Sequence, residues 1–283
     1  ASTSCYNSGD LGVSSDTSCS TEKLTISGAV NITSTNTLNI KGGWMHAKKL
    51  DVVTGGTLNI TDSNVTFNST GRILGNIILN NATLNLSVSQ TRFQSGSFVN
   101  ITGSTLYTKN ATIHAPFVID PSNWTNIGNL SINNTVNITD TILNVTHEFK
   151  ILENATFNAT NSTIYTNITR INGSNVTVDP STWIEEGDLI VGPGAIMDYI
   201  DTGVIVAGKV LVDGGTLNFL TNSVLQMNKD NQPATGSEIK VRDLDGMDGL
   251  LYIDSTSKIE RNSTTDYDFT VYDGGSFTLE KNV

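Results

Sequence analysis

The chain has 283 residues and a mass of 30.3 kDa, which is enough to bury a large β core. Charged residues make up only 15% of it, whereas 39 Thr, 27 Ser and 32 Asn dominate, a mixture that disfavours helices and favours strands and turns. The net charge of -11 argues against a nucleic-acid partner, and no apolar run approaches the roughly 20 residues of a membrane-spanning helix.

Residues 1–22 form a polar amino-terminal segment that holds both cysteines, Cys5 and Cys19. With no third cysteine and no histidine nearby, a metal site is disfavoured, and one disulfide bond is expected rather than two unpaired thiols. The first residue is Ala1, as in a secreted chain whose signal peptide has been removed, although a trimmed chain would look the same. These features favour a secreted protein at the cell surface.

From residue 23 onward the sequence repeats a short pattern in which two strands flank a corner. Each copy reads apolar-x-apolar, a turn of Gly, Asn or Asp, and then Thr or Ser followed by apolar-x-apolar. Residues 75–86 (GNIILNNATLNL) align with 208–219 (GKVLVDGGTLNF), and further copies occupy 50–60, 128–138 and 269–279. Weaker copies begin near Leu24, Val99, Ile151, Leu189 and Leu251, and a longer gap predicts a unit around Ile239.

Several neighbouring copies are about 20 residues apart, a spacing typical of stacked coils. Two longer internal repeats support this period. Residues 100–108 match 158–166, and 119–130 match 178–189. In each of these longer repeats the two segments are offset by about three short units. Strands this short bury an apolar face only when successive coils stack. We therefore expect an all-β protein, a right-handed parallel β-helix (a β-solenoid) with coils of about 20 residues. One or two antiparallel β-sandwich domains are the alternative.

The acceptor pattern for N-glycosylation, Asn-x-Ser/Thr, is far more frequent than chance allows. It begins at 20 of the 32 asparagines, whereas random pairing would give about 7 or 8. The 20 positions are Asn31, Asn59, Asn64, Asn68, Asn81, Asn85, Asn100, Asn110, Asn123, Asn129, Asn133, Asn137, Asn144, Asn154, Asn158, Asn161, Asn167, Asn172, Asn175 and Asn262. In triplets such as Leu58-Asn59-Ile60, the asparagine should face solvent if its neighbours face the core. We expect several of these sites to carry N-glycans on the outer wall.

Residues 181–283 differ in charge from the sequon-rich residues 23–180. They carry 17 acidic and 7 basic side chains, against 10 and 9 in residues 1–180. We expect this part to be an acidic continuation of the solenoid or a second β domain. Its loop 242–249 (RDLDGMDG) places Asp243, Asp245 and Asp248 beside flexible glycines, as in a calcium loop, but it departs from the EF-hand spacing and lacks the closing Glu. The alternative is two Asp-Gly turns, and no other cofactor is expected.

The sequence gives no sign of catalytic machinery. Its three histidines share no metal-ligand spacing, and it has no nucleophile elbow, phosphate loop or paired-cysteine metal motif. β-Helix folds host polysaccharide lyases and hydrolases, but the carboxylate pairs Asp51/Asp62 and Glu148/Glu153 have no distinguishing context. We therefore expect a protein that is not an enzyme.

Two tryptophans, Trp124 and Trp183, occupy equivalent places in two Asp-Pro-Ser-x-Trp segments. If exposed, they would stack on sugar rings. Because they recur at the same place in a coil, we expect them to be packing anchors instead.

A solenoid stops growing only when its terminal coils are covered. The sequence has no amphipathic helix at either end, whereas residues 1–22 could cap one end or reach a neighbouring molecule. We therefore expect copies of the chain to associate head to tail into a homopolymer, by stacking of exposed coils or by strand addition.

The sequon-dense, Thr/Asn-rich strands resemble archaeal extracellular surface glycoproteins, meaning filament or thread-like subunits and S-layer-associated β proteins. They also resemble secreted right-handed β-helix adhesins. The resemblance covers most of the chain and lies in its composition and periodicity. It implies a structural subunit of an N-glycosylated cell-surface filament or sheath. The alternatives are a monomeric adhesin or carbohydrate-binding module, and a β-helix polysaccharide lyase or hydrolase.

Overall fold

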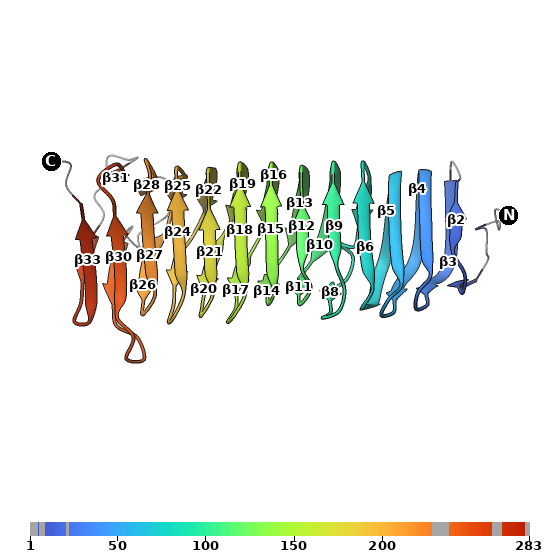
Figure 1. The fold of residues 1–283 in the computed structure, drawn as a ribbon, viewed down its shortest axis with the longest axis horizontal. Coiled ribbons are helices and arrows are strands. Elements are labelled where there is room, and N and C mark those ends of the chain that lie inside the picture. Colours follow the sequence, from blue (N-terminus) through green and yellow to red (C-terminus); the bar gives the residue numbers. More distant parts are fainter. Residues whose placement is uncertain (1–4, 6–8, 21–22, 228–237, 262–267, 281–283) are drawn as a thin grey trace. The chain divides into compact units, whose positions relative to one another are not determined.

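The computed structural model describes residues 5, 9–20, 23–227, 238–261 and 268–280, and within these ranges every regular element is a β-strand (Figure 1). The chain contains two compact units, Ala1–Leu130 with Val136–Thr141, and Ser131–Thr135 with Ile142–Val283. Each unit is a stack of coils whose strands pair in parallel with those of the next coil. The structure therefore confirms the predicted β-solenoid, and an antiparallel sandwich is excluded.

Each coil of the first unit has three faces. They are named A, B and C, and the chain passes through them in the order A, C, B. Face A contains β2 (Thr17–Cys19), β6 (Asn76–Asn80), β9 (Val99–Thr102), β12 (Phe117–Ile119) and β15 (Thr135–Thr139). Face C contains β7 (Thr83–Asn85), β10 (Ser104–Lys109) and β13 (Ser122–Ile127). Face B contains β1 (Leu11–Val13), β8 (Arg92–Phe93) and β11 (Thr112–Ile113). The long strands β3 (Lys23–Ile32), β4 (Thr37–Val52) and β5 (Thr57–Ile73) cross more than one face.

The second unit repeats this order after β14 (Leu130–Ile132), which lies at the division between the units. Face A contains β18 (Thr156–Thr160), β21 (Asn175–Val178), β24 (Ile196–Ile200), β27 (Thr216–Leu220), β30 (Gly249–Ile253) and β33 (Gly275–Leu279). Face C contains β16 (Thr141–Val145), β19 (Ser162–Thr166), β22 (Ser181–Glu185), β25 (Gly203–Val206), β28 (Val224–Met227) and β31 (Lys258–Arg261). Face B contains β17 (Glu148–Ile151), β20 (Ile168–Ile171), β23 (Leu189–Val191), β26 (Lys209–Asp213), β29 (Glu238–Arg242) and β32 (Asp268–Val271).

The pairing register gives the length of each coil directly. In the first unit Leu38 pairs with Leu58 and Leu58 with Ile77. In the second unit Val176 pairs with Met197, which gives nearly the same coil length. These pairings confirm the coil period that the sequence repeat predicted. A later coil is longer, because Leu217 pairs with Leu251.

The core of each coil follows from the alternation of side chains along short strands. In β24, Met197 and Tyr199 are fully buried, whereas the residues between and beside them are not. Large inward side chains stack from coil to coil: the rings of Trp183 and Tyr199 lie 6.0 Å apart, and those of Tyr199 and Phe219 5.2 Å apart. Burial of these rows supplies the main stabilisation of a fold whose single coils have no core of their own.

The corner between face A and face C is built by residues in the left-handed backbone region. Six of them are Asp62, Asn81, Gly103, Asp140, Asn161 and Asp201, with φ between 47° and 57°. Glycine, Asn and Asp tolerate this region better than other residues do, because most side chains clash there with the backbone. The Gly, Asn and Asp turns that the sequence pattern placed between apolar strands therefore have a direct structural role.

The predicted disulfide bond joins Cys5 to Cys19, with its Cα atoms 5.6 Å apart, and both side chains are buried. Cys19 ends β2, which pairs with β4, and β1 pairs with β3. The segment 1–22 thus contributes two strands to the first coil in addition to holding the bond. By the chain-entropy model, closing a loop of this size contributes about 3 kcal/mol.

The repeat alignment is confirmed as a pattern of two short strands around a turn, but its copies do not all occupy the same corner of the coil. Residues 76–80 and 83–85 lie on faces A and C, whereas 209–213 and 216–220 lie on faces B and A, so the best-matching copies are different corners. The two longer repeats are confirmed, because the two segments of each pair occupy the same part of the coil. The unit expected around Ile239 is also confirmed, as Ile239 in β29 pairs with Val210.

The described residues from 181 onward continue the coils of the second unit, since β22 pairs with β19 and β23 with β20 across residue 180. The change in charge at this point therefore coincides with no break in strand pairing. The division between the compact units lies earlier in the chain, within the sequon-rich part.

Candidate functional site

The sequon asparagines form the most distinctive feature of the outer wall. Nineteen of the 20 lie in the described residues, and none of these 19 is buried; Asn262 lies outside the described residues. Twelve are exposed: Asn64, Asn68, Asn81, Asn110, Asn123, Asn129, Asn144, Asn154, Asn161, Asn167, Asn172 and Asn175. Seven are half-buried: Asn31, Asn59, Asn85, Asn100, Asn133, Asn137 and Asn158. The acceptor amides therefore lie on the outside of the coils.

The strand alternation accounts for this orientation. In five triplets the asparagine faces outward while both apolar neighbours are buried: 58–60, 84–86, 99–101, 136–138 and 143–145. The predicted parity is confirmed in each of them. A strand with an inward apolar residue on either side can only direct the residue between them to solvent.

One buried asparagine provides the contrast. Asn126 has no exposed surface, and it is followed by Ile127 and Gly128, so it is not part of a sequon. Its Oδ1 accepts hydrogen bonds from the Thr108 hydroxyl (2.9 Å) and the Ala111 amide (3.1 Å), and its Nδ2 donates to the Gly128 carbonyl (3.1 Å). Its side chain satisfies groups in the core.

On face A of the first unit the acceptors alternate with apolar residues from coil to coil. The register along this row is Asn59, Ile78, Asn100, Val118 and Asn137. Neighbouring coils lie about 4.8 Å apart, so consecutive acceptors in the row are separated by about 10 Å. That spacing leaves room for a bulky substituent on every second coil.

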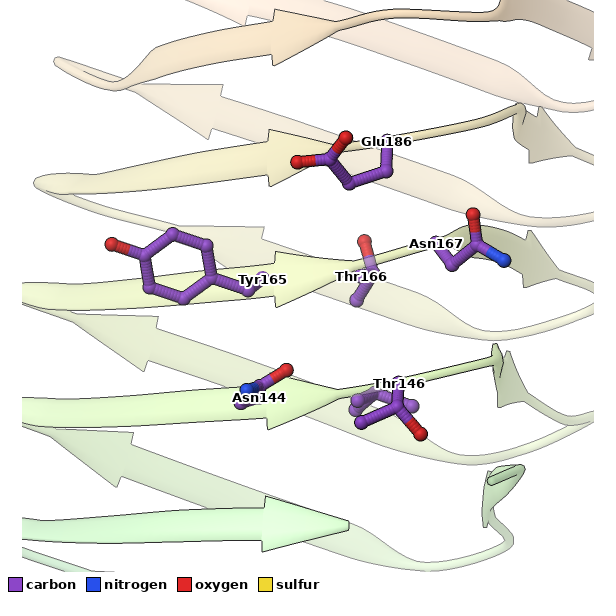
Figure 2. A pocket seen from close by; sticks show the side chains of 7 residues that line it. Asn144, Thr146, Tyr165, Thr166, Asn167 and Glu186 are labelled. Carbon is purple, nitrogen blue, oxygen red and sulfur yellow. The ribbon is translucent and has the colours of Figure 1, made fainter. Parts of the chain in front are cut away.

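A recess of about 320 Å³ lies on the wall of the second unit (Figure 2). Its lining residues are Asn144, Val145, Thr146, Tyr165, Thr166, Asn167 and Glu186. Two of the seven, Asn144 and Asn167, are sequon acceptors, and Thr146 completes the sequon of Asn144. The volume is at the small end of the roughly 300–1,000 Å³ range of ligand pockets.

The two tryptophans of the Asp-Pro-Ser-x-Trp segments are buried, so they are packing anchors as expected. Trp124 Nε1 donates to the Thr108 hydroxyl at 3.0 Å, and Trp183 Nε1 donates to the Thr166 hydroxyl at 3.2 Å. A sugar cannot stack on either ring while it is enclosed in the core.

A buried carboxyl group, Glu185, lies next to Trp183 and was missed by the sequence analysis. Its Oε2 accepts hydrogen bonds from the hydroxyls of Thr166 (2.7 Å) and Thr169 (2.5 Å), whereas Oε1 has no hydrogen-bond partner. Burial raises the pKa of Glu185 to about 7, against the opposing effect of these hydrogen bonds and with a smaller contribution from Asp188. In the matching segments 119–130 and 178–189, Glu185 occupies the place that corresponds to Asn126.

The carboxylates considered as catalytic pairs have structural contacts. Asp51 accepts from the Arg72 amide (2.8 Å) and pairs with Lys49 (2.7 Å), and Asp62 accepts from Asn81 Nδ2 (2.7 Å). Glu148 pairs with the side chains of Lys150 and Arg170. The structure gives these groups no shared site.

The acidic loop 242–249 is organised by its own turn. Asp243 Oδ1 accepts from the Gly246 amide (2.9 Å), and Leu244 forms an antiparallel bridge with Met247. Asp245 and Asp248 are exposed, and no group of three or more His, Cys, Asp or Glu side chains in the described residues is arranged to hold a metal ion. Calcium binding stays a prediction.

No helix in the described part of the chain is long and apolar enough to cross a membrane. No protein-family model, no curated protein and no solved structure matches the chain. Function is therefore inferred from the chain's own residues.

Proposed function

We propose that the chain is a structural subunit of an extracellular, N-glycosylated filament or sheath at the cell surface, in which copies associate head to tail. The observation that carries this proposal is the outward orientation of every described sequon asparagine, in contrast to the buried Asn126. An asparagine on the outer wall can carry a glycan without disrupting the core, whereas one in the place of Asn126 could not. The resemblance to archaeal surface glycoproteins and the disulfide bond agree with an extracellular setting.

Glycans on this wall would give it a hydrophilic surface with little charge. In residues 1–180 only 19 side chains are acidic or basic, so polarity comes mainly from Asn, Thr and Ser. Such a surface changes little with pH or salt, because it contains few ionisable groups. This property suits a structural protein that is permanently exposed outside the cell.

The coil of β31, β32 and β33 offers a surface for association. Residues that would be covered by a following coil are partly exposed there: Phe269 by 37%, Phe277 by 38% and Leu279 by 60%. Together with Ile253, Ser257, Lys258 and Ile259 they line a recess of about 470 Å³. Exposed apolar surface and open strand edges favour pairing with another chain.

The first coil differs, because its inward residues Val13, Cys19 and Leu24 are already buried. Its strands β1 and β2 pair only with later strands among the described residues, which leaves an edge for strand pairing. We therefore propose that the apolar surface of β31–β33 in one copy meets the β1–β3 edge of the next. A heterologous contact of this kind gives an open filament when its symmetry does not close.

A charge placed in the apolar surface tests this association. Wild-type protein is expected to form filaments in electron microscopy and a high-mass species in light scattering, whereas Phe277→Asp should remain monomeric because it buries an unpaired carboxylate at the contact. The matched control is Ile142→Asp, which replaces a half-exposed apolar residue on the outer wall and should still assemble. A monodisperse wild-type monomer at high concentration would refute the filament and favour a monomeric adhesin.

A further inference from the structure

The exposed Trp and Tyr side chains on strands of residues 23–180 share one relation to the sequons. They are Trp44, Tyr107 and Tyr165, which are 36%, 37% and 40% exposed. Each is the register partner of a sequon asparagine in an adjacent coil: Trp44 of Asn64, Tyr107 of Asn85, and Tyr165 of Asn144. Register partners on one sheet face lie about 5 Å apart, so each ring lies beside an acceptor amide.

The best-defined of these pairs lies in the recess of the second unit. Figure 2 shows Asn144 and Tyr165 on neighbouring coils, with Thr146 and Asn167 farther along the same two coils. Asn144 is exposed, and its strand partner Tyr165 leaves two fifths of its surface in solvent. The recess thus combines an attachment point, an apolar ring and surrounding polar groups.

We propose that the asparagine-linked sugar of Asn144 packs against the ring of Tyr165 in this recess, and that Tyr107 and Trp44 receive the sugars of Asn85 and Asn64 in the same way. This inference rests on the proposed function, because it requires N-glycosylation. The ligand class is the first pyranose of an N-glycan. It is attached when Asn144 Nδ2 loses a proton and bonds to the sugar's anomeric carbon, displacing the phosphate-linked carrier of an activated glycan donor.

Two physical reasons favour this contact. The C–H groups of a pyranose face are apolar and slightly positive, so they complement the negative face of an aromatic ring and cover it from water. The sugar is also tethered covalently beside the ring, so packing does not cost the translational freedom that a free ligand would lose. An exposed aromatic ring that is unfavourable on the bare chain is therefore covered on the glycosylated one.

The test uses the natively glycosylated protein and four variants: Tyr165→Ser, Tyr165→Phe, Asn144→Gln, and Asn144→Gln combined with Tyr165→Ser. We expect Tyr165→Ser to lower the melting temperature by about 2–4 °C more when Asn144 is glycosylated than in the Asn144→Gln background, because the loss of the ring's own packing is common to both. Tyr165→Phe should behave as wild type, because the ring is retained. Asn167→Gln, which removes the second acceptor of the recess, is the matched control.

A direct readout is the NMR spectrum of the sugar. Protons of the Asn144-linked pyranose should show upfield ring-current shifts that Tyr165→Ser abolishes and that Tyr165→Phe and Asn167→Gln preserve. A glycan on Asn144 without these shifts would overturn this inference and leave the proposed function intact. A bare Asn144 among glycosylated neighbours would do the same, whereas a chain without any glycan would refute both.

Discussion

The free energy of unfolding is expected to fall by about 3 kcal/mol between pH 4.5 and pH 8 through Glu185 alone. Its pKa is about 7 in the folded protein and 4.5 as the ordinary value, and each unit of difference corresponds to about 1.4 kcal/mol. The unfolded chain releases the proton near pH 4.5, whereas the folded chain keeps it until about pH 7. The contribution is therefore fully present below pH 4.5 and is lost as the pH rises through 7.

Chemical denaturation at a series of pH values measures this effect, and Glu185→Gln is the matched variant. The glutamine cannot ionise, so the variant should be more stable than wild type at pH 8 and should lose this advantage at pH 4.5. Asp254 does not interfere with this measurement. Desolvation raises its pKa, but hydrogen bonds from backbone and side-chain groups outweigh it and lower the pKa to about 2, below this window. An equal pH dependence in wild type and Glu185→Gln would show that Glu185 is not the responsible group.

Replacing Trp183 by Ala is expected to destabilise the protein by about 3–5 kcal/mol, the usual cost of removing a buried large aromatic side chain. Trp183 has no exposed surface, and its ring lies 6.0 Å from those of both Phe149 and Tyr199. The variant leaves a cavity and also removes the indole donor to the Thr166 hydroxyl.

The matched control for this variant is Trp44→Ala, because Trp44 is 36% exposed on the outer wall. On the bare polypeptide it should cost less than Trp183→Ala, because the Trp44 ring lies against His46 (5.7 Å between ring centroids) and the Lys23 ammonium (5.7 Å) on the outer wall and not against core side chains. Urea denaturation of the two variants gives both values. A cost below about 1 kcal/mol for Trp183→Ala would contradict the packing described for this core.

The sequence predicted the alternation and the coil length because both are local properties. A strand has a period of two on every face of a solenoid, so apolar neighbours such as Leu58 and Ile60 predict an outward Asn59 before the face is known. The same locality explains why 75–86 and 208–219 match although they form different corners. Different corners share one pattern of short strands around a turn residue, so similarity alone does not show which corner a copy forms.

Other features depend on the register between coils, which the lengths of the corners decide. The pairing of Tyr165 with Asn144 could not be predicted, because one residue more in a corner would shift it. For the burial of Glu185 the sequence contained only a weak signal. Asn126, which occupies the equivalent place in the matching segment, has no sequon although it lies in the sequon-rich part of the chain. Both lie two residues after a tryptophan anchor and therefore face inward with it.

Site-resolved glycopeptide mapping of the native protein, together with its intact mass before and after deglycosylation, tests the central claim most directly. We expect glycans on several of the 19 outward sequon asparagines and an unmodified Asn126, with a corresponding loss of mass on deglycosylation. A native mass equal to that of the bare 30.3 kDa polypeptide, or a glycan on Asn126, would contradict the account.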